Sequence, residues 1–441
     1  MKEVDRFPAK AGDLGWFETS TYKNHRFADI AALQSDYDYV VVGGGFAGVN
    51  AAFKLAENKP DAKIALFDAL HIGMGDSGRN AGFLIDVPHS FGEPGISVDD
   101  HKWRMRLNNI VIDRMRKIKD DNKLHCDWMD VGKYLAAREP QFIKNLNGMA
   151  GVLDSIGAPY KMLDKEELPA LMGTNYYVKA LYTYGSVLIN PADVIRALAS
   201  ALPENVQVFE ETPVLQVHEG SPVNVRLVNG KSVRAGQVLL LTSVFIDQFG
   251  IKEKGRMTPV NSFGAFTREL TEEELLGFKG VAPWGCTSGH PAGTTVRFTA
   301  TNRVFVRNGF TYATHLCTSP QRIHYARKKL RKSFEARFPN LRHVNFEYVY
   351  GGMIPMTLNG ESMFTTVAQN VHAASVGDGA GLTRSAMLGV YLADLACGVD
   401  SEELRYLQKT SHPRWCPPDP FRTVGATVRL AYEELCSKGE T

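Results

Sequence analysis

The sequence predicts an α/β protein with more than one domain, and three observations support this class. Residues 39–42 form a β-branched apolar run, glycines crowd positions 43–48, and an Ala-rich segment with apolar residues at helical spacing follows. A second apolar run at 63–67 completes a strand–helix–strand unit. The length of 441 residues suggests two or three domains, and the apolar fraction of 44% is typical of a globular chain.

The glycines of this unit fit a nucleotide-binding turn. Gly43, Gly45 and Gly48 have the spacing G-x-G-x-x-G. In this pattern the first glycine makes the tight turn, the second admits a pyrophosphate, and the third lets the helix pack on the strand. The start of the helix would present free N–H groups to the phosphates. An ordinary βαβ unit with a tight turn is the alternative, but the order of strand, glycines, helix and strand favours a dinucleotide site.

An acidic residue ends the second predicted strand. Asp68 stands 68 − 48 = 20 positions after Gly48, where an acid binds the ribose 2′-OH of an adenosine. Its carboxylate would repel a 2′-phosphate, so NADP is disfavoured, and FAD and NAD remain. A second glycine-rich loop at 72–82 carries Ser, Arg and Asn, which suit the remaining pyrophosphate charge and a flavin ring, so the sequence favours FAD. A solvated loop is the alternative, because loops favour such residues anyway.

Three stretches carry a resemblance to a known family. The loop at 75–82 reads GDSGRNAG, which resembles the pattern G-x-[SG]-x-R-N-x-G of the FAD-dependent amino-acid and amine oxidases (D-amino-acid oxidase, glycine oxidase, sarcosine oxidase, γ-glutamylputrescine oxidase). Residues 348–357 resemble the family's W-x-G…P-x-T segment, with Tyr350 or Val349 near the usual Trp. Residues 371–383 resemble its strand, glycine loop and helix, with Ala380 where His is frequent.

This resemblance covers most of the chain and implies its fold. The expected architecture is α/β, with a Rossmann-like FAD-binding domain and an antiparallel-sheet substrate domain, of the D-amino-acid oxidase/glutathione-reductase-2 type. The expected limits are 1–35 for an N-terminal arm that packs on the body, 36–95, 186–245 and 345–441 for a discontinuous FAD-binding domain, and 96–185 and 246–344 for the substrate domain.

The glycine turn and the resemblance together give the expected cofactor contacts. By resemblance, Val214 supplies backbone contacts to the adenine, and the helix N-terminus at 379–383 faces the flavin pyrimidine edge, where its amides would stabilise negative charge. No attachment motif is clear at Cys286 or Cys317, so non-covalent FAD is expected. The expected contacts are Gly43, Gly45, Phe46, Ala47, Gly48, Asp68, Ala69, Gly75, Ser77, Arg79, Asn80, Ala81, Gly82, Val214, Thr242, Ser243, Gly352, Gly379, Ala380, Gly381, Leu382 and Thr383.

Four residues are candidates for contact with the substrate. His89 follows the flavin loop and could touch substrate or flavin, although a lone His is more often an ordinary polar contact. Alternation along a predicted strand puts Arg303 and Arg307 on one face. In relatives an Arg or Tyr on the substrate-domain sheet holds the substrate carboxylate, so Arg303, Arg307 or Tyr312 is expected to do so here. No motif selects among them, and solvated surface arginines are the alternative.

By resemblance, the expected reaction is oxidation of the C–N bond of a primary or secondary amine or amino acid. Hydride would pass to flavin N5, the imine would hydrolyse to a carbonyl product, and oxygen or a respiratory carrier would take the electrons. The first alternative is a flavin dehydrogenase of a 2-hydroxy acid or similar alcohol, which needs a base near N5 and would make His89 essential. A second alternative is a non-catalytic FAD-binding subunit, whose flavin would never bleach with an amine.

Composition argues against other classes. The net charge is +2, and the basic stretch at 322–332 is balanced by acids elsewhere, so no nucleic-acid partner is expected. The six cysteines form no C-x-x-C pair, so neither a metal site nor a dithiol motif is indicated. The sequence contains no apolar run of 18 residues, so no transmembrane segment is expected. The N-terminus lacks a signal-peptide apolar region, so a cytoplasmic location is expected.

Overall fold

The predicted strand–helix–strand unit forms the centre of the first sheet in the computed structural model, which describes residues 1–89, 91–92, 95–379 and 381–441. β1 and β2 pair in parallel, and the helix between them is α2 (Phe46–Asn58). The strand order is β10-β11-β12-β1-β2-β9, with β19 beside β12 and β18 beside β19. The strands are β1 (Asp36–Val42), β2 (Ile64–Phe67), β9 (Val206–Phe209), β10 (Val214–His218), β11 (Val223–Leu227), β12 (Ser232–Leu240), β18 (Met363–Ala368) and β19 (Val371–Ser375).

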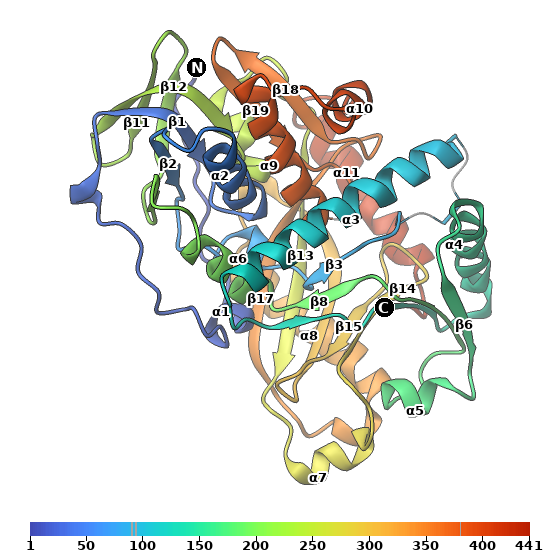
Figure 1. Ribbon diagram of the computed structural model, residues 1–441. Coiled ribbons are helices and arrows are strands. Elements are labelled where there is room, and N and C mark those ends of the chain that lie inside the picture. The colour runs from blue at the N-terminus through green and yellow to red at the C-terminus, as the bar shows by residue number, and fades with distance from the viewer. Residues whose placement is uncertain (90, 93–94, 380) are drawn as a thin grey trace.

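Side chains of β1 alternate between two hydrophobic cores. Val41 points to the core shared with the helices, whereas Val40 points to the core shared with β10, β11 and β12. Figure 1 shows the helices that gather on the first of these faces. They are α2, α3 (Val98–Asp121), α6 (Pro191–Ser200) and α9 (Gly381–Cys397). A strand covered on both sides needs continuous apolar residues, which explains the run at 39–42.

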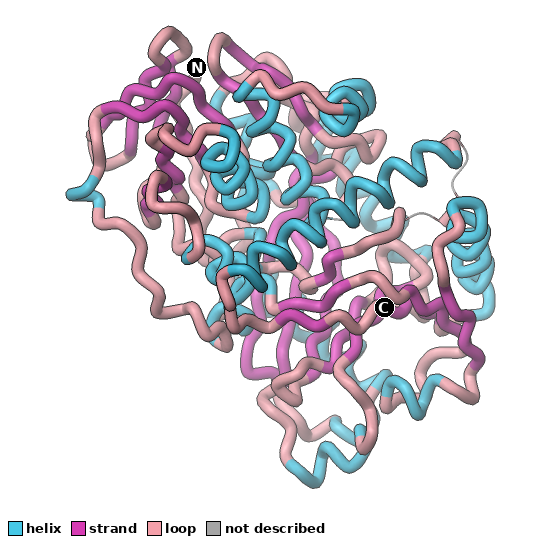
Figure 2. The backbone as a smooth tube through the Cα atoms, in the orientation of Figure 1, coloured by secondary structure: helices cyan, strands magenta, loops and turns pink. Residues whose placement is uncertain are grey.

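The second sheet is antiparallel except where β14 pairs with β5 in parallel, and Figure 2 shows its strands beside the first sheet. Its order is β17-β13-β16-β15-β14-β5-β7-β6. Leu330 and Phe334 of α8 (Pro320–Arg337) pack against Val304 and Val306 on one face. The strands are β5 (Lys133–Ala137), β6 (Tyr160–Asp164), β7 (Lys179–Thr183), β13 (Thr258–Thr267), β14 (Trp284–Ser288), β15 (Thr295–Phe298), β16 (Val304–Tyr312) and β17 (Phe346–Met356).

A small third sheet forms where the chain passes between the two large sheets. Its order is β3-β8-β4, from β3 (Phe83–Leu84), β8 (Val187–Ile189) and β4 (Trp128–Met129). Asn190 then caps α6, because its Oδ1 accepts from the N–H groups of Ala192 and Asp193. The remaining α-helices are α1 (Gly15–Glu18), α4 (Ile143–Ile156), α5 (Leu168–Met172), α7 (Glu272–Leu275), α10 (Glu402–Thr410) and α11 (Phe421–Cys436).

The strand pairing does not agree with the expected start of an FAD-domain segment at residue 345. β17 pairs along its length with β13 of the second sheet, and α11 packs on β16 of that sheet. Both segments follow residue 345, yet both lie with the antiparallel sheet. The chain therefore returns to the first sheet only at β18. The other domain limits stay predictions.

Within the described part of the chain, no single helix combines the length and hydropathy that crossing a membrane requires. α9 and α10 meet that requirement only as a pair bent by 108°.

Candidate functional site

The glycine turn after β1 has the geometry that the sequence motif predicts. Gly43 has φ +105°, and a Cβ there would lie 2.4 Å from the carbonyl oxygen of Leu241. A Cβ on Gly48 would lie 1.7 Å from the carbonyl oxygen of Gly43, so only glycine lets α2 start this close to the turn. A Cβ on Gly45 would lie 2.3 Å from Ser77 Oγ. The three glycines thus fix the turn, the helix and the contact with the second loop.

A cavity of about 410 Å³ opens at the carboxyl ends of β1, β2, β12 and β19 and extends to the second sheet. This edge of an open α/β sheet is where ligands bind. Most of the expected cofactor contacts line it. They are Gly43, Gly45, Ala47, Asp68, Ala69, Gly75, Ser77, Arg79, Asn80, Ala81, Gly82, Val214, Thr242, Ser243, Gly352, Gly379, Gly381 and Leu382.

Three expected contacts lie behind the wall, and one lies outside the described residues. Phe46 is fully buried in the helix core, and its backbone N–H donates to Ser77 Oγ at 3.2 Å. Gly48 packs on the turn. Thr383 Oγ1 accepts from the N–H of Ile85 at 2.9 Å. Ala380 is the expected contact outside the described residues. Phe46, Gly48 and Thr383 therefore support the wall from behind.

Asp68 is held by two backbone donors beside the glycine turn. Its Oδ2 accepts from Gly44 N at 2.7 Å, and its Oδ1 accepts from Leu70 N at 2.8 Å. Burial, opposed by these hydrogen bonds, raises the pKa of Asp68 to about 6. The carboxylate is therefore mostly ionised at pH 7 and is fixed in the cavity wall.

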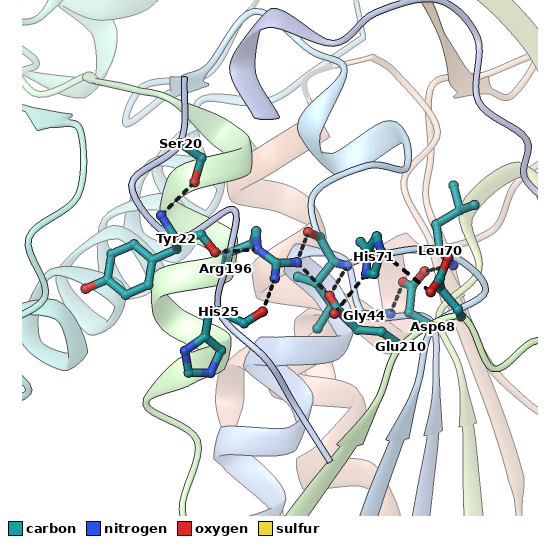
Figure 3. Close-up of polar contacts among 11 residues, drawn as sticks. Ser20, Tyr22, His25, Gly44, Asp68, Leu70, His71, Arg196 and Glu210 are labelled. Atoms are coloured by element: carbon teal, nitrogen blue, oxygen red, sulfur yellow. Dashed lines mark hydrogen bonds and ion pairs between the residues drawn. The ribbon is translucent and has the colours of Figure 1, made fainter. Parts of the chain in front are cut away.

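A buried arginine connects the loop after Asp68 to the N-terminal arm. Figure 3 shows Arg196 of α6 between the carbonyl groups of Tyr22 and His25, to which it donates at 2.9 and 2.8 Å. Its Nη1 also pairs with Glu210 at 2.6 Å. Glu210 in turn accepts from the backbone N–H of Ile72 at 2.6 Å. The loop after Asp68 is thus fastened to the arm through one guanidinium.

Arg79 has a structural position in the second glycine loop. It is 7% exposed, and it donates to the carbonyl oxygens of Met74, Ala11 and Gly351 at 2.8, 3.0 and 3.1 Å. Burial lowers its pKa, opposed by the charge of Asp76. Its Nη2 has no hydrogen-bond partner among the described residues. Arg79 therefore joins the loop, the arm and β17 at the cavity wall.

Another buried arginine fixes the end of the same loop. Nη1 of Arg297, on β15, donates to the carbonyl oxygens of Ala81, Gly82 and Ile189 at 2.9, 3.2 and 2.6 Å. Gly82 has φ +70°, and a Cβ there would lie 2.4 Å from this nitrogen. Burial lowers the pKa of Arg297 to about 10, which leaves it charged at neutral pH.

Of the three carboxylate-binding candidates, only Arg307 lines the cavity. Its guanidinium carbon lies 4.9 Å from the ring centre of Phe310, which also lines the cavity. No carboxylate of a described residue lies within ion-pair distance of it. Burial lowers its pKa to about 10, so it carries a charge at neutral pH that no described acid balances.

Arg303 directly precedes β16, and Tyr312 is its last residue. Arg303 forms an ion pair with Glu347 and donates to the carbonyl of Thr267 at 2.9 Å, outside the cavity. Tyr312 is 7% exposed beside the segment that leads into α11, where burial raises its pKa. Neither is placed to hold a substrate in this cavity. The expectation that one of three residues binds the carboxylate therefore narrows to Arg307.

His89 lines the same end of the cavity as Arg307 and is accessible from it. The surrounding protein disfavours its charged form, and the charges of Lys133, Arg384 and Arg307 add to this effect. Together they lower the pKa of His89 to about 3. The imidazole is therefore neutral throughout the physiological range.

The N-terminal arm contributes cavity residues that the sequence did not indicate. Val4, Arg6, Phe7 and Pro8 line the end of the cavity near Val214. Backbone hydrogen bonds hold this part of the arm, from Lys2 N to Phe249 O at 2.9 Å and from Val4 N to Leu215 O at 2.8 Å. The arm's aromatic residues were the one sequence signal of packing. Trp16 is 2% exposed and donates through Nε1 to the carbonyl of Asn80 at 2.8 Å.

These residues fit an adenine dinucleotide. A glycine cradle that a Cβ would fill, an acid at the end of β2 and a helix beginning at Gly381 all meet at one cavity. Thr242 Oγ1 lies buried in the wall without a hydrogen-bond partner among the described residues, so it is available to a ligand. The cavity volume lies within the usual range for cofactor sites.

Comparisons with known proteins agree with this geometry. The family described as FAD dependent oxidoreductase (DAO) matches residues 38–395. The probable oxidoreductase OrdL of Haemophilus influenzae is 26% identical over 91% of this chain and 92% of its own length. The gamma-glutamylputrescine oxidoreductase of Escherichia coli is 24% identical over 90% and 92%. The solved glycine oxidase of Geobacillus kaustophilus is similar over 84% of this chain and 96% of its own, with a TM-score of 0.70 and 18% identity.

Proposed function

Because the chain belongs to the FAD dependent oxidoreductase family, and is an FAD-dependent oxidoreductase, we propose that it oxidises the C–N bond of a primary or secondary amine that bears an anionic head group. The substrate would lose its α-hydrogen with the electron pair, and its nitrogen would lose a proton. Water would add to the imine and release a carbonyl product with ammonia or a smaller amine. FAD supplies the hydride acceptor for this chemistry.

Arg307 carries the proposal for the head group. It is a charged guanidinium in the cavity wall with no described carboxylate beside it. A buried charge without a partner is costly, and a substrate carboxylate would offset that cost through two parallel hydrogen bonds. Phe310 beside it would hold the guanidinium plane and the apolar part of the substrate. Together they would orient the α-carbon of the substrate. We expect this orientation to supply much of the rate enhancement.

Nearby positive charge would also help the amine to react. Hydride loss needs a neutral amine, and positive charge lowers the pKa of an ammonium group. The same environment keeps His89 neutral, so its ring nitrogen can accept a hydrogen bond from the substrate N–H. A lowered pKa makes His89 a poorer proton acceptor, which counts against the alternative reaction on a 2-hydroxy acid, where a hydroxyl proton must be removed.

We also infer that FAD is held without a covalent bond to Cys286 or Cys317. Cys286 is fully buried, Cys317 is exposed, and neither lines the cavity. Oxygen and a respiratory carrier both fit as electron acceptor.

Anaerobic bleaching of the flavin absorbance tests the proposal. Purified holoenzyme would be mixed with pools of anionic amines and of 2-hydroxy acids. We expect bleaching by an amine pool, and Arg307→Ala should lower kcat/KM for the active amine by about 100-fold, the loss of a bidentate charged contact. Arg303→Ala, directly before the same strand and outside the cavity, is the matched control and should stay within about twofold of the wild type. Bleaching only by hydroxy acids would replace the proposal with the alternative.

A further inference from the structure

Helix α11 (Phe421–Cys436) presents an apolar stripe to the surface. Five of its side chains are 58 to 72% exposed. At about 100° per residue, these five positions fall within an arc of about 80° on one side of the helix. Single exposed apolar residues are ordinary, but five on one face of one helix form a continuous patch. The five are Phe421, Val424, Val428, Tyr432 and Leu435.

The opposite side of α11 fastens the helix to the body. Leu430 faces β16, and Glu433 Oε2 lies 3.7 Å from His290 Nε2. Glu434 pairs with Lys329 of α8. Arg422 donates to the carbonyl of Met257 at 3.3 Å. Because the inner side holds the helix, the outer stripe is free for another molecule.

The area of the stripe suits a protein interface. The five side chains expose on the order of 600 Å² of apolar surface, at the upper limit for the largest patch on a monomer. A standard interface buries about 800 Å² on each partner, so the stripe with its polar margin is large enough to be the centre of one.

The stripe is also complementary to itself when two helices run antiparallel. Positions equally far from Val428 face each other in that arrangement, and 428 − 421 = 435 − 428 = 7 pairs Phe421 with Leu435. Likewise 428 − 424 = 432 − 428 = 4 pairs Val424 with Tyr432. A two-fold axis through Val428 therefore brings large side chains together from both copies.

Small residues and charges follow the same symmetry. Gly425 and Ala431 both stand three positions from Val428, so the two helices can approach closely beside the axis. Arg422 and Glu434 also stand six positions away, but both face the body of their own chain, so the stripe itself carries no charge. A lipid surface would instead favour a cationic margin, whereas the four charges of α11, Arg422, Arg429, Glu433 and Glu434, sum to zero.

We propose that α11 is a homodimer interface, in which a second copy of this chain packs its own α11 antiparallel across a two-fold axis at Val428. The inner side of α11 lines a second cavity of about 460 Å³ with Leu430 and Glu433. That cavity shares Phe310, Ile354 and two further residues with the cofactor cavity, so the contact would hold α11 against a wall next to the active site.

Measurement of the mass in solution tests the proposal. By light scattering or sedimentation, FAD-loaded protein should have twice the chain mass of 48.8 kDa, or about 98 kDa. Val428→Asp places two carboxylates at the axis and should give the monomer with unchanged FAD content and circular dichroism. Leu276→Asp is the matched control, because Leu276 is 70% exposed on another element, and it should stay dimeric.

Cross-linking tests the arrangement independently of V428D. Helices 8–10 Å apart bring the two backbones at Val428 within disulfide range, so Val428→Cys should give an intermolecular disulfide on mild oxidation. Leu435→Cys alone should not, because it faces Phe421 of the other copy. A wild type that is monomeric at 100 μM would overturn the proposal. So would a dimer that V428D leaves intact, or binding to phosphatidylglycerol vesicles that V428D abolishes.

Discussion

Asp68 combines two properties that oppose each other in the cavity wall. Burial raises its pKa to about 6, so the ionised form is costly there, whereas two backbone N–H groups hold that form in place. Ribose hydroxyls donate to a carboxylate, so a bound dinucleotide would supply the missing partners. We therefore expect a bound dinucleotide to stabilise the ionised form of Asp68.

Replacement of this carboxylate should weaken cofactor binding. We expect Asp68→Asn to raise the Kd for FAD at pH 8 by about 10-fold to 100-fold, because a hydrogen bond to a charged group contributes roughly 1.5–3 kcal/mol. Asp36→Asn is the control, because Asp36 pairs with Arg234 at the exposed start of β1. Quenching of FAD fluorescence gives the Kd, and an unchanged value in D68N would remove Asp68 from the site.

The same carboxyl group predicts a pH dependence. Its folded-state pKa is raised above the ordinary value of 3.8, so the empty protein takes up a proton as pH falls through 6. The cost of burying the charge is present above pH 6 and is relieved below it. FAD affinity should therefore fall as pH drops from 7 to 5, and part of that fall should disappear in D68N. A wild-type Kd that is constant over this range would contradict the assignment.

At the scale of elements, the N-terminal arm acts as a wall of the cofactor cavity. Its first residues line the cavity, its middle accepts hydrogen bonds from Arg79 and Gly351 at Ala11, and its end is held by Asp193 through Ser20 and Thr21. A dinucleotide that enters the cavity is enclosed by the arm. The arm and the cofactor therefore stabilise each other.

Shortening one arm side chain should loosen the cofactor. Phe7→Ser removes an apolar side chain from the cavity wall, and we expect FAD to dissociate about 10-fold faster, since burial of such a side chain contributes roughly 1.5–3 kcal/mol. Lys10→Ala, at an exposed position of the same arm that does not line the cavity, should leave the rate unchanged. Stopped-flow dilution followed by flavin fluorescence measures the rate of FAD dissociation. Equal rates in the two variants would show that the arm is only a surface strap.

Local patterns predicted the elements well, and long-range contacts set the limit. The glycine turn, α2 and Asp68 follow each other within one short segment, so the sequence predicted their arrangement. Arg303 and Arg307 look alike on an alternating strand, and only Glu347, from a distant strand, separates a paired arginine from an unpaired one. The arm's place at the cavity likewise depends on Leu215 and Phe249, about two hundred residues away.

At the scale of the molecule, the cavity joins both large sheets. Gly43 and Asp68 line it from the first sheet, and Arg307 and Gly352 line it from the second. A ligand that spans the cavity contacts the folded state only, so it stabilises the whole chain by mass action.

FAD should raise the unfolding temperature more than its fragments do. At a free concentration of 100 times Kd, binding stabilises the fold by about 2.7 kcal/mol. For a chain of 441 residues, with an unfolding entropy of about 2.1 cal/mol/K per residue, that corresponds to roughly 3 °C. FMN and ADP, which each reach one end of the cavity, should give smaller shifts at the same concentration. Differential scanning calorimetry measures all three, and an FMN shift equal to that of FAD would remove the adenosine end from the site.

The walls of the cofactor cavity have a consequence for how the enzyme is made. Val4 and Leu388 line the same cavity although 388 − 4 = 384 positions separate them, so the arm meets partners that are synthesised much later. Chains are made from the N-terminus, and Ala11 can therefore bind Arg79 and Gly351 together only after β17 has been synthesised. A chain that stops before β17 would lack this part of the cavity wall. We therefore expect such a truncated chain to hold less flavin than the full chain.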